Sequence, residues 1–194
     1  MKKQMTLGQY RAIDLAILGG VYGICEVLIY VSYTFWYANE LYIASPIAAV
    51  TAIVMMRWGG WAGIHAAAGG LLYAYLRQGS WQQLLTYGAG NLLALAALAL
   101  LKLLGKERIR NSAFLSVMFG LCVQLLMQVG RGLVSALLGT AFDACIGYIT
   151  TDILSTLLTL VIIWIVRKAD GLFEDQKHYL LRLESERHKV EGRE

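Results

Sequence analysis

Long runs of uncharged, mainly apolar residues dominate this sequence, and small groups of basic residues mark where the runs end. The chain has 194 residues, of which 58% are hydrophobic and only 15% charged, whereas soluble domains carry about 25% charged residues. The net charge of +4 does not indicate a nucleic-acid partner, because the lysines and arginines flank apolar runs and are not interleaved on one surface. This arrangement predicts an all-α integral membrane protein.

Six segments are long enough, or nearly so, to be transmembrane helices, which need about 20 residues, or fewer where partners cover their ends. They cover residues 12–33, 42–56, 58–76, 83–101, 112–130 and 148–166. The second and third are divided by Arg57 and a Trp58-Gly59-Gly60-Trp61 turn. Residues 131–147 are apolar but broken by glycines, and we interpret them as a re-entrant or outer-surface connection. The first segment has a basic start but no cleavage site, so we expect it to be retained in the protein.

The basic residues predict the orientation, because lysine and arginine favour the cytoplasmic ends of spans. With the N-terminus inside, ten of them fall on the cytoplasmic side: Lys2, Lys3, Arg11, Arg57, Lys102, Lys106, Arg108, Arg110, Arg167 and Lys168. Two fall outside, Arg77 and Arg131. Both termini are therefore expected on the cytoplasmic side. We take the membrane to be a bacterial cell membrane.

The composition divides the chain into a transmembrane domain, residues 1–168, and a charged cytoplasmic tail, residues 169–194. In the tail, Phe173, Leu180 and Leu183 recur at roughly helical spacing among charged residues, which predicts a short amphipathic helix. Such a helix can be solvated, lie on the membrane surface or dock on a partner.

Motifs for catalysis or metal binding are missing from the sequence. It has no HExxH, no GxSxG and no phosphate-binding loop, and Cys25, Cys122 and Cys145 lack metal-ligand spacing. We therefore expect no enzyme activity, no metal and no cofactor. His65, alone within a predicted span, is interpreted as a hydrogen-bonding residue between packed helices.

Polar residues inside the predicted spans are the candidates for function, because an ionisable group there costs about 2.5–3.5 kcal/mol to insert. Glu26 lies roughly 10 Å below the outer end of the first span, and Gln124 and Gln128 form an i, i+4 pair. The polar groups expected to line one outward-opening pocket are Glu26, Asn39, Asn91, Gln124, Gln128, Arg131, Asp143 and Asp152. The alternative is an internal ion pair of Arg131 with a carboxylate, plus caps at the interface.

Six aromatic residues fall within residues 30–42, the connection after the first span. An aromatic belt at the membrane surface explains part of this density, and a lid that stacks on a flat ligand explains the excess. Tyr33, Trp36 and Tyr37 are therefore candidate ligand contacts. Together with the carboxylates, these rings favour a cationic or zwitterionic heteroaromatic ligand.

Small residues recur every four positions on the first span, at Ala12, Ala16 and Gly20, and again at Gly19 and Gly23. This spacing lets another helix approach closely. The neighbour is either a helix of the same bundle or, because Ala12 and Ala16 lie at the cytoplasmic end, a separate partner protein.

Four features resemble the substrate-binding S component of energy-coupling factor (ECF) transporters. They are six spans in about 170 residues, the Ala12-Ile13-Asp14-Leu15-Ala16 motif, the aromatic connection, and Arg57-Trp58-Gly59-Gly60-Trp61-Ala62-Gly63 at the start of the third helix. The resemblance covers residues 11–168 and implies a subunit that captures a vitamin-like micronutrient at the outer face. A transmembrane coupling protein and two ATPase subunits would be its partners.

The resemblance also implies roles for individual residues. Ala12 and Ala16 would contact the coupling protein, and Tyr148 joins Trp36, Tyr37, Asn91, Gln128, Arg131 and Asp143 as a candidate ligand contact by its position. Two other classes stay open: a six-helix membrane scaffold of the cell-shape type, which would bind no solute, and an intramembrane enzyme, which would need convergence of Glu26, His65 and Asp152.

Overall fold

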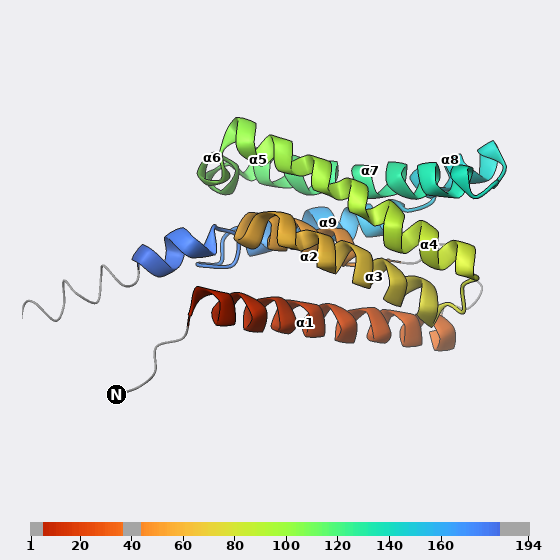
Figure 1. Cartoon of the computed structure of the whole chain (residues 1–194), viewed down its shortest axis with the longest axis horizontal. Helices are drawn as coiled ribbons and strands as arrows, with labels where there is room; N and C mark the ends of the chain where they lie inside the picture. The colour runs from red at the N-terminus through yellow and green to blue at the C-terminus, as the bar shows by residue number, and fades with distance from the viewer. Residues whose placement is uncertain (1–5, 37–43, 183–194) are drawn as a thin grey trace, which may run out of the picture.

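The described residues of the chain, 6–36 and 44–182, form helices and no strands in a computed structural model (Figure 1). Five helical segments of this part are long and apolar enough to cross a membrane: Leu7–Trp36, Ile47–Leu76, Trp81–Leu104, Ala113–Leu137 and Phe142–Val166. The chain is thus an α-helical protein of the multi-pass membrane type. The bundle has two distinct ends. The basic end holds the start of α1, α6 and the C-terminal segment, and the far end holds the end of α1 and the α3–α4 and α7–α8 connections (Figure 1).

The first helix, α1 (Leu7–Trp36), is a long rod on one side of the bundle. The side chain of Thr6 accepts a hydrogen bond from the backbone N–H of Gln9, whose side chain accepts one from the N–H of Thr6, so a capping box starts the helix. Its 30 residues span about 45 Å, more than the roughly 30 Å of a hydrocarbon core.

The segment Ile47–Leu76 folds back on itself at Gly59. α2 (Ile47–Trp58) ends there, a short 3₁₀ turn η1 (Gly59–Trp61) follows, and α3 (Ala62–Leu76) returns. Gly59 has a φ of +62°, which an L residue rarely adopts, and this confirms the predicted turn. Contacts with α1 show the reversal, because Arg57 reaches Asp14, whereas Ser45 and Arg77 both reach Glu26.

The next segment combines α4 (Trp81–Gly90), the 3₁₀ stretch η2 (Asn91–Ala97) and α5 (Leu98–Leu104). A capping box between Ser80 and Gln83 starts α4. After Gly105, the short helix α6 (Lys106–Asn111) lies at the basic end and leads into α7.

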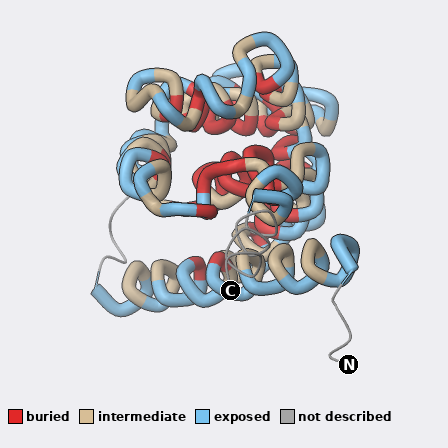
Figure 2. Tube along the Cα trace, turned by 90° about the vertical axis from the view of Figure 1, so that its left-hand side faces the viewer, coloured by how far each residue is buried: buried red, intermediate tan, exposed pale blue. Residues whose placement is uncertain are grey.

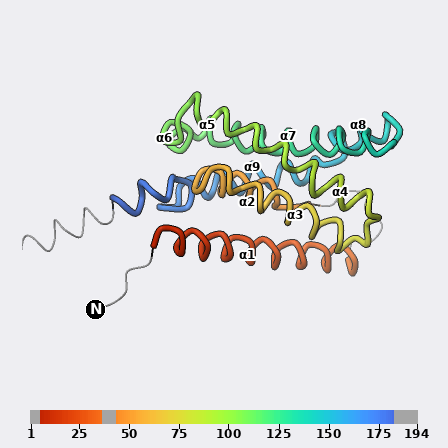
Figure 3. The backbone as a smooth tube through the Cα atoms, viewed as in Figure 1, coloured from red at the N-terminus to blue at the C-terminus, as the bar shows by residue number. Residues whose placement is uncertain are grey.

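Residues 131–147 do not form the expected re-entrant or surface connection. Instead, α7 (Ala113–Leu137) continues through Arg131 for two further turns, a tight turn follows, and α8 (Phe142–Thr150) runs back along α7. α9 (Ile153–Val166) continues the same return path after a break at Asp152 (Figure 3). The expectation failed because Gly132 sits inside α7, where an added Cβ would lie 3.2 Å from the Cys145 carbonyl oxygen, and the helix ends only near Gly139, which has a φ of +86°.

Burial is uneven across the helices (Figure 2). α2 lies in the centre, with all of its residues from Ile47 to Arg57 buried except Val50. By contrast, only 11% of the most apolar stretch of α1 is buried, and its Ile13, Ile17 and Ile24 are exposed. An apolar exposed face of this length is what lipid contact requires.

The C-terminal segment packs against the basic end of the bundle. Phe173 is fully buried there, in the same cluster as Ile109 and Phe119. A helix begins at Gln176, after Asp175, whose carboxylate accepts hydrogen bonds from the backbone N–H groups of Lys177 and His178. Residues 176–182 of the predicted tail are therefore helical, and Phe173 precedes this helix and anchors it to the bundle.

Candidate functional site

The two arginines that the sequence places outside both lie in buried ion pairs in the half of the bundle toward the far end. Nη1 of Arg77, at the C-terminal end of α3, lies 3.0 Å from Oε1 of Glu26. The other carboxylate oxygen of Glu26 accepts a 2.7 Å hydrogen bond from the Ser45 hydroxyl. Glu26 is fully buried, so both of its oxygens are satisfied inside the protein.

The second ion pair joins α7 to the break between α8 and α9. Nη1 of Arg131 lies 2.9 Å from Oδ2 of Asp152, and the Gln124 amide donates to the same oxygen at 3.0 Å. Nε of Arg131 donates to Oδ1 of Asn91 at 2.7 Å, and the Asn91 amide donates in turn to the Ala66 carbonyl on α3. This set ties four helical segments together through buried polar groups.

Two tyrosines connect the two ion pairs, and a third packs against them. The guanidinium of Arg77 lies 3.7 Å from the ring centre of Tyr73, and that of Arg131 lies 4.9 Å from the ring centre of Tyr87. The Tyr73 and Tyr87 centroids are 4.7 Å apart, and Tyr148 meets Tyr87 edge-on at 5.8 Å. We call the two ion pairs, their hydrogen-bond partners and these tyrosines the polar network.

Close backbone contact between α4 and α7 positions the second ion pair. A Cβ on Gly130 would lie 2.0 Å from the Gly90 carbonyl oxygen, so neither helix can come this close with a larger residue. Asn91 and Arg131 directly follow these glycines, and the contact therefore sets their side chains against each other.

The polar network has unused hydrogen-bonding capacity. In the described part of the chain, buried atoms without a hydrogen-bond partner include Nε and Nη2 of Arg77 and the side-chain oxygens of Gln124 and Gln128. Buried polar groups of this kind are rare without a ligand or water to satisfy them. A cavity of about 380 Å³ lies next to the network at the far end, lined by Tyr148 and Thr86 and by residues of the α3–α4 and α7–α8 connections.

The structure brings together about half of the residues predicted for the pocket. Glu26, Asn91, Gln124, Arg131, Tyr148 and Asp152 belong to the network, and Gln128 joins it through a weak 3.4 Å hydrogen bond to Thr156. Trp36 is 75% exposed at the end of α1, Tyr33 is half-buried, and Asp143 is exposed in the first turn of α8. Tyr37 and Asn39 lie outside the described residues.

Sequence reasoning missed Arg77, Tyr73, Tyr87 and Ser45 as members of the network. The sequence does mark Arg77 as unusual, since it is one of only two basic residues predicted on the outer side of the membrane. No such signal marks the tyrosines, because tyrosines in spans are expected at membrane interfaces anyway. The expected alternative, an internal Arg131–carboxylate pair, exists as part of the same network.

Two of the carboxylates that favoured a cationic ligand, Glu26 and Asp152, are paired with arginines. Glu26 is bound by Arg77 and Ser45, and Oδ2 of Asp152 is bound by Arg131 and Gln124. The two arginines and two carboxylates of the network balance in formal charge. A ligand therefore meets a neutral, already paired set of charges.

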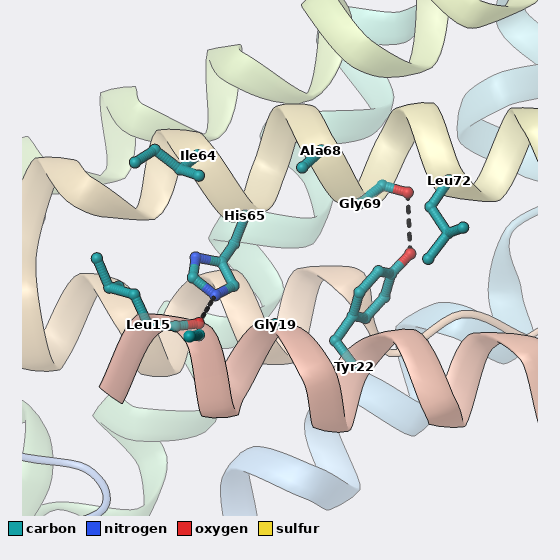
Figure 4. A pocket seen from close by; sticks show the side chains of 9 residues that line it. Leu15, Gly19, Tyr22, Ile64, His65, Ala68, Gly69 and Leu72 are labelled. Carbon is teal, nitrogen blue, oxygen red and sulfur yellow. Dashed lines mark hydrogen bonds between the residues drawn. The ribbon is translucent and has the colours of Figure 1, made fainter. Parts of the chain in front are cut away.

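A second, apolar groove of about 280 Å³ separates α1 from α3 (Figure 4). The Nε2–H of His65 donates a 3.0 Å hydrogen bond to the Leu15 carbonyl, and the Tyr22 hydroxyl donates to the Gly69 carbonyl at 2.9 Å. Both bonds fasten α1 to α3. The enzyme candidates Glu26, His65 and Asp152 each bind a separate partner, and no group of three metal-ligating side chains occurs among the described residues.

The small-residue ladders of α1 face different neighbours. Gly19 and Gly23 face α3, and a methyl group added at these positions would meet His65 and Leu72 respectively. Ala12, Ala16 and Gly20 are exposed, and nothing lies within 4 Å of a Cβ on Gly20. The first ladder is thus exposed, with Ala16 at the edge of the groove between α1 and α3.

Buried charge also occurs at the basic end. Asp14 accepts hydrogen bonds of 2.5 Å from both Nη2 of Arg57 and the Trp58 indole, and another Arg57 nitrogen donates to the Gly171 carbonyl of the C-terminal segment. On α6, Lys106 lies 2.5 Å from Asp175, and Arg110 pairs with Glu174. These bonds hold the C-terminal segment onto the bundle beside the start of α1.

Comparison with known proteins adds no assignment, since no protein-family model, no curated protein and no solved structure matches this chain.

Proposed function

We propose that this chain is the membrane-embedded solute-binding subunit of an ECF-type importer, which captures a small vitamin-like micronutrient at the outer face of a bacterial cell membrane. The observation that carries the proposal is the polar network, with two buried ion pairs and unsatisfied polar atoms in the half of the bundle toward the far end. A mainly apolar site with a few convergent polar groups is the usual architecture for a small-molecule ligand.

In this proposal the chain crosses the membrane six times, with the α2–α3 hairpin supplying two of the crossings. Each arm is shorter than the roughly 20 residues of an independent transmembrane helix. Because other helices enclose α2, its length need not match the thickness of the hydrocarbon core. The basic end faces the cytoplasm, and the far end with its 380 Å³ cavity faces outward.

The exposed ladder Ala12, Ala16 and Gly20 is the proposed docking surface for the coupling protein. It lies on a helix that contributes little to the core, near the basic end, and its small side chains permit close helix contact. The chain has no phosphate-binding loop, and the two ATPase subunits would supply the energy. A membrane scaffold protein of similar design would also need such a ladder to bind a partner protein. It would not need the polar network, because it binds no solute.

Mass spectrometry of the purified protein, under native conditions in lipid nanodiscs, tests the proposal. We expect one small molecule bound per chain in the wild type. The variant Arg131→Gln/Asp152→Asn, which removes both charges of one pair while keeping polar groups, should lose it. The matched control is Arg110→Gln at the basic end, which should retain it. A folded wild-type protein without a bound small molecule would contradict the proposal.

A further inference from the structure

One edge of the Arg77 guanidinium is buried and unused. Nη1 donates to Glu26 at 3.0 Å and to the Tyr73 carbonyl at 3.2 Å, and the group stacks on the Tyr73 ring. Nε and Nη2, which point in the same direction along the opposite edge, are buried and have no hydrogen-bond partner within the described residues. A buried N–H of a charged group without an acceptor is costly.

This edge is fixed in place by its neighbours. The Arg77 side chain is 14% exposed, and its partner Glu26 is 0% exposed and held in turn by Ser45, whose backbone N–H bonds the Ser155 hydroxyl on α9. The guanidinium is therefore oriented before any ligand arrives, which reduces the entropy lost on binding. Ser80, three residues after Arg77 in the chain, lines the cavity at the far end.

We propose that the solute carries a carboxylate, which the Nε–Nη2 edge of Arg77 binds through two parallel hydrogen bonds. This inference rests on the proposed function and names the substrate class. The fork of a guanidinium edge matches the two oxygens of a carboxylate. A phosphate monoester fits less well, because it carries about two negative charges and Arg77 already shares its one positive charge with Glu26.

The same geometry reverses the ligand charge favoured by the sequence. A cation would need a free carboxylate, but Glu26 has both oxygens bound. Glu26 thus acts as a positioning residue that holds Arg77, and Arg77 makes the contact with the solute.

The test uses the small molecule that co-purifies with the full-length protein, released by denaturation and treated with acidic methanol. Each carboxyl group gains the mass of one CH₂ unit on esterification, so mass spectrometry before and after treatment counts the carboxyl groups. We expect at least one. A bound solute that has no carboxyl group, including a phosphate ester, overturns the inference and leaves the proposed function standing. A folded protein with no bound solute overturns the proposed function, and the inference with it.

Variants then test the residue. Because Arg77→Gln alone leaves a buried unpaired carboxylate, the informative change is Glu26→Gln/Arg77→Gln, in which two amides can still bond each other. Its affinity for the purified solute, measured by calorimetry, should fall roughly 10- to 100-fold, as expected for the loss of a charge-assisted pair. The control variant Arg110→Gln, at the basic end and outside the polar network, should stay within about threefold of the wild type. An affinity of the double variant that also stays within about threefold would contradict a contact through Arg77.

Discussion

Asp14 on α1 and Arg57 at the end of α2 are bound to each other by two hydrogen bonds, of 2.5 and 2.8 Å, at the basic end of the bundle. Their side chains are only 14% and 6% exposed, and Trp58 donates to the same carboxylate. Together with Glu26 and Arg77 toward the far end, this pair fastens the peripheral α1 to the α2–α3 hairpin at two levels.

Removing the Asp14 carboxylate should destabilise the protein. Asp14→Ala leaves Arg57 buried without its counter-charge, and we expect a loss of about 3 kcal/mol in the free energy of unfolding, measured in mixed micelles. Asp14→Asn keeps an acceptor for Trp58 and should lose less. Equal losses in both variants would show that charge pairing is not what stabilises this contact.

A methyl group at Gly130 should disrupt the contact between α4 and α7. Its Cβ would lie 2.0 Å from the backbone oxygen of Gly90, which cannot rotate away, so Gly130→Ala should cost about 3 kcal/mol and lower the melting temperature. The control is Gly20→Ala, where the space is open and helix propensity predicts a gain of up to about 1 kcal/mol. Similar melting temperatures for the two variants would contradict the close packing.

Bulky residues on the exposed ladder should block transport without affecting solute binding. We expect Ala12→Trp/Ala16→Trp to abolish uptake in cells that contain the coupling protein and ATPases, because close helix contact is prevented. The bound solute should remain detectable in the purified variant. Ile24→Trp, on an exposed part of the same helix, is the control and should support normal uptake. If the double variant loses its solute, the ladder has a structural role.

Cysteine labelling can determine the orientation of the bundle. In a background without Cys25, Cys122 and Cys145, an impermeant reagent on intact cells should label Thr140→Cys at the far end and not Arg108→Cys at the basic end. Both positions are exposed. Labelling of Arg108→Cys alone would reverse the proposed topology.

The attachment of the C-terminal segment should depend on pH only under acidic conditions. Burial raises the pKa of Asp175, but its hydrogen bond and ion pair with Lys106 outweigh burial and hold the pKa below its ordinary value of 3.8. When the segment is detached, the Asp175 carboxylate has its ordinary pKa and binds protons more readily. Its contribution to holding the segment on the bundle is therefore complete above pH 3.8 and is lost as the pH falls through the lowered pKa.

Spin labels at Leu103→Cys and Lys177→Cys, again without the native cysteines, would report the distance between the segment and the bundle. We expect a constant distance from pH 7 to about 5 and a broader distribution below about 4. In Asp175→Asn this transition should weaken or vanish. A transition near pH 6 in the wild type would contradict the assignment to Asp175.

The sequence predicted the helical class and most helix positions, because apolar runs and their polar ends are local signals. The turn at Gly59 was predictable for the same reason. The extension of α7 through Arg131 was not, because Gly130 is expected to break a helix until its contact with Gly90 is known. Several site residues, such as Glu26 and Asp152, stand out as charges in apolar runs. Their pairing with Arg77 and Arg131 depends on which helices become neighbours, and that information is not local.

The α2–α3 hairpin has a consequence for biosynthesis. α2 has 12 residues and α3 has 15, and neither offers insertion machinery the roughly 20 apolar residues of an independent membrane anchor. The two arms together, joined through the tight reversal at Gly59, pass that threshold as one unit of 30 residues. The central helix of the bundle therefore enters the bilayer with its neighbour, and the later-made α7 and α9 complete the packing around it.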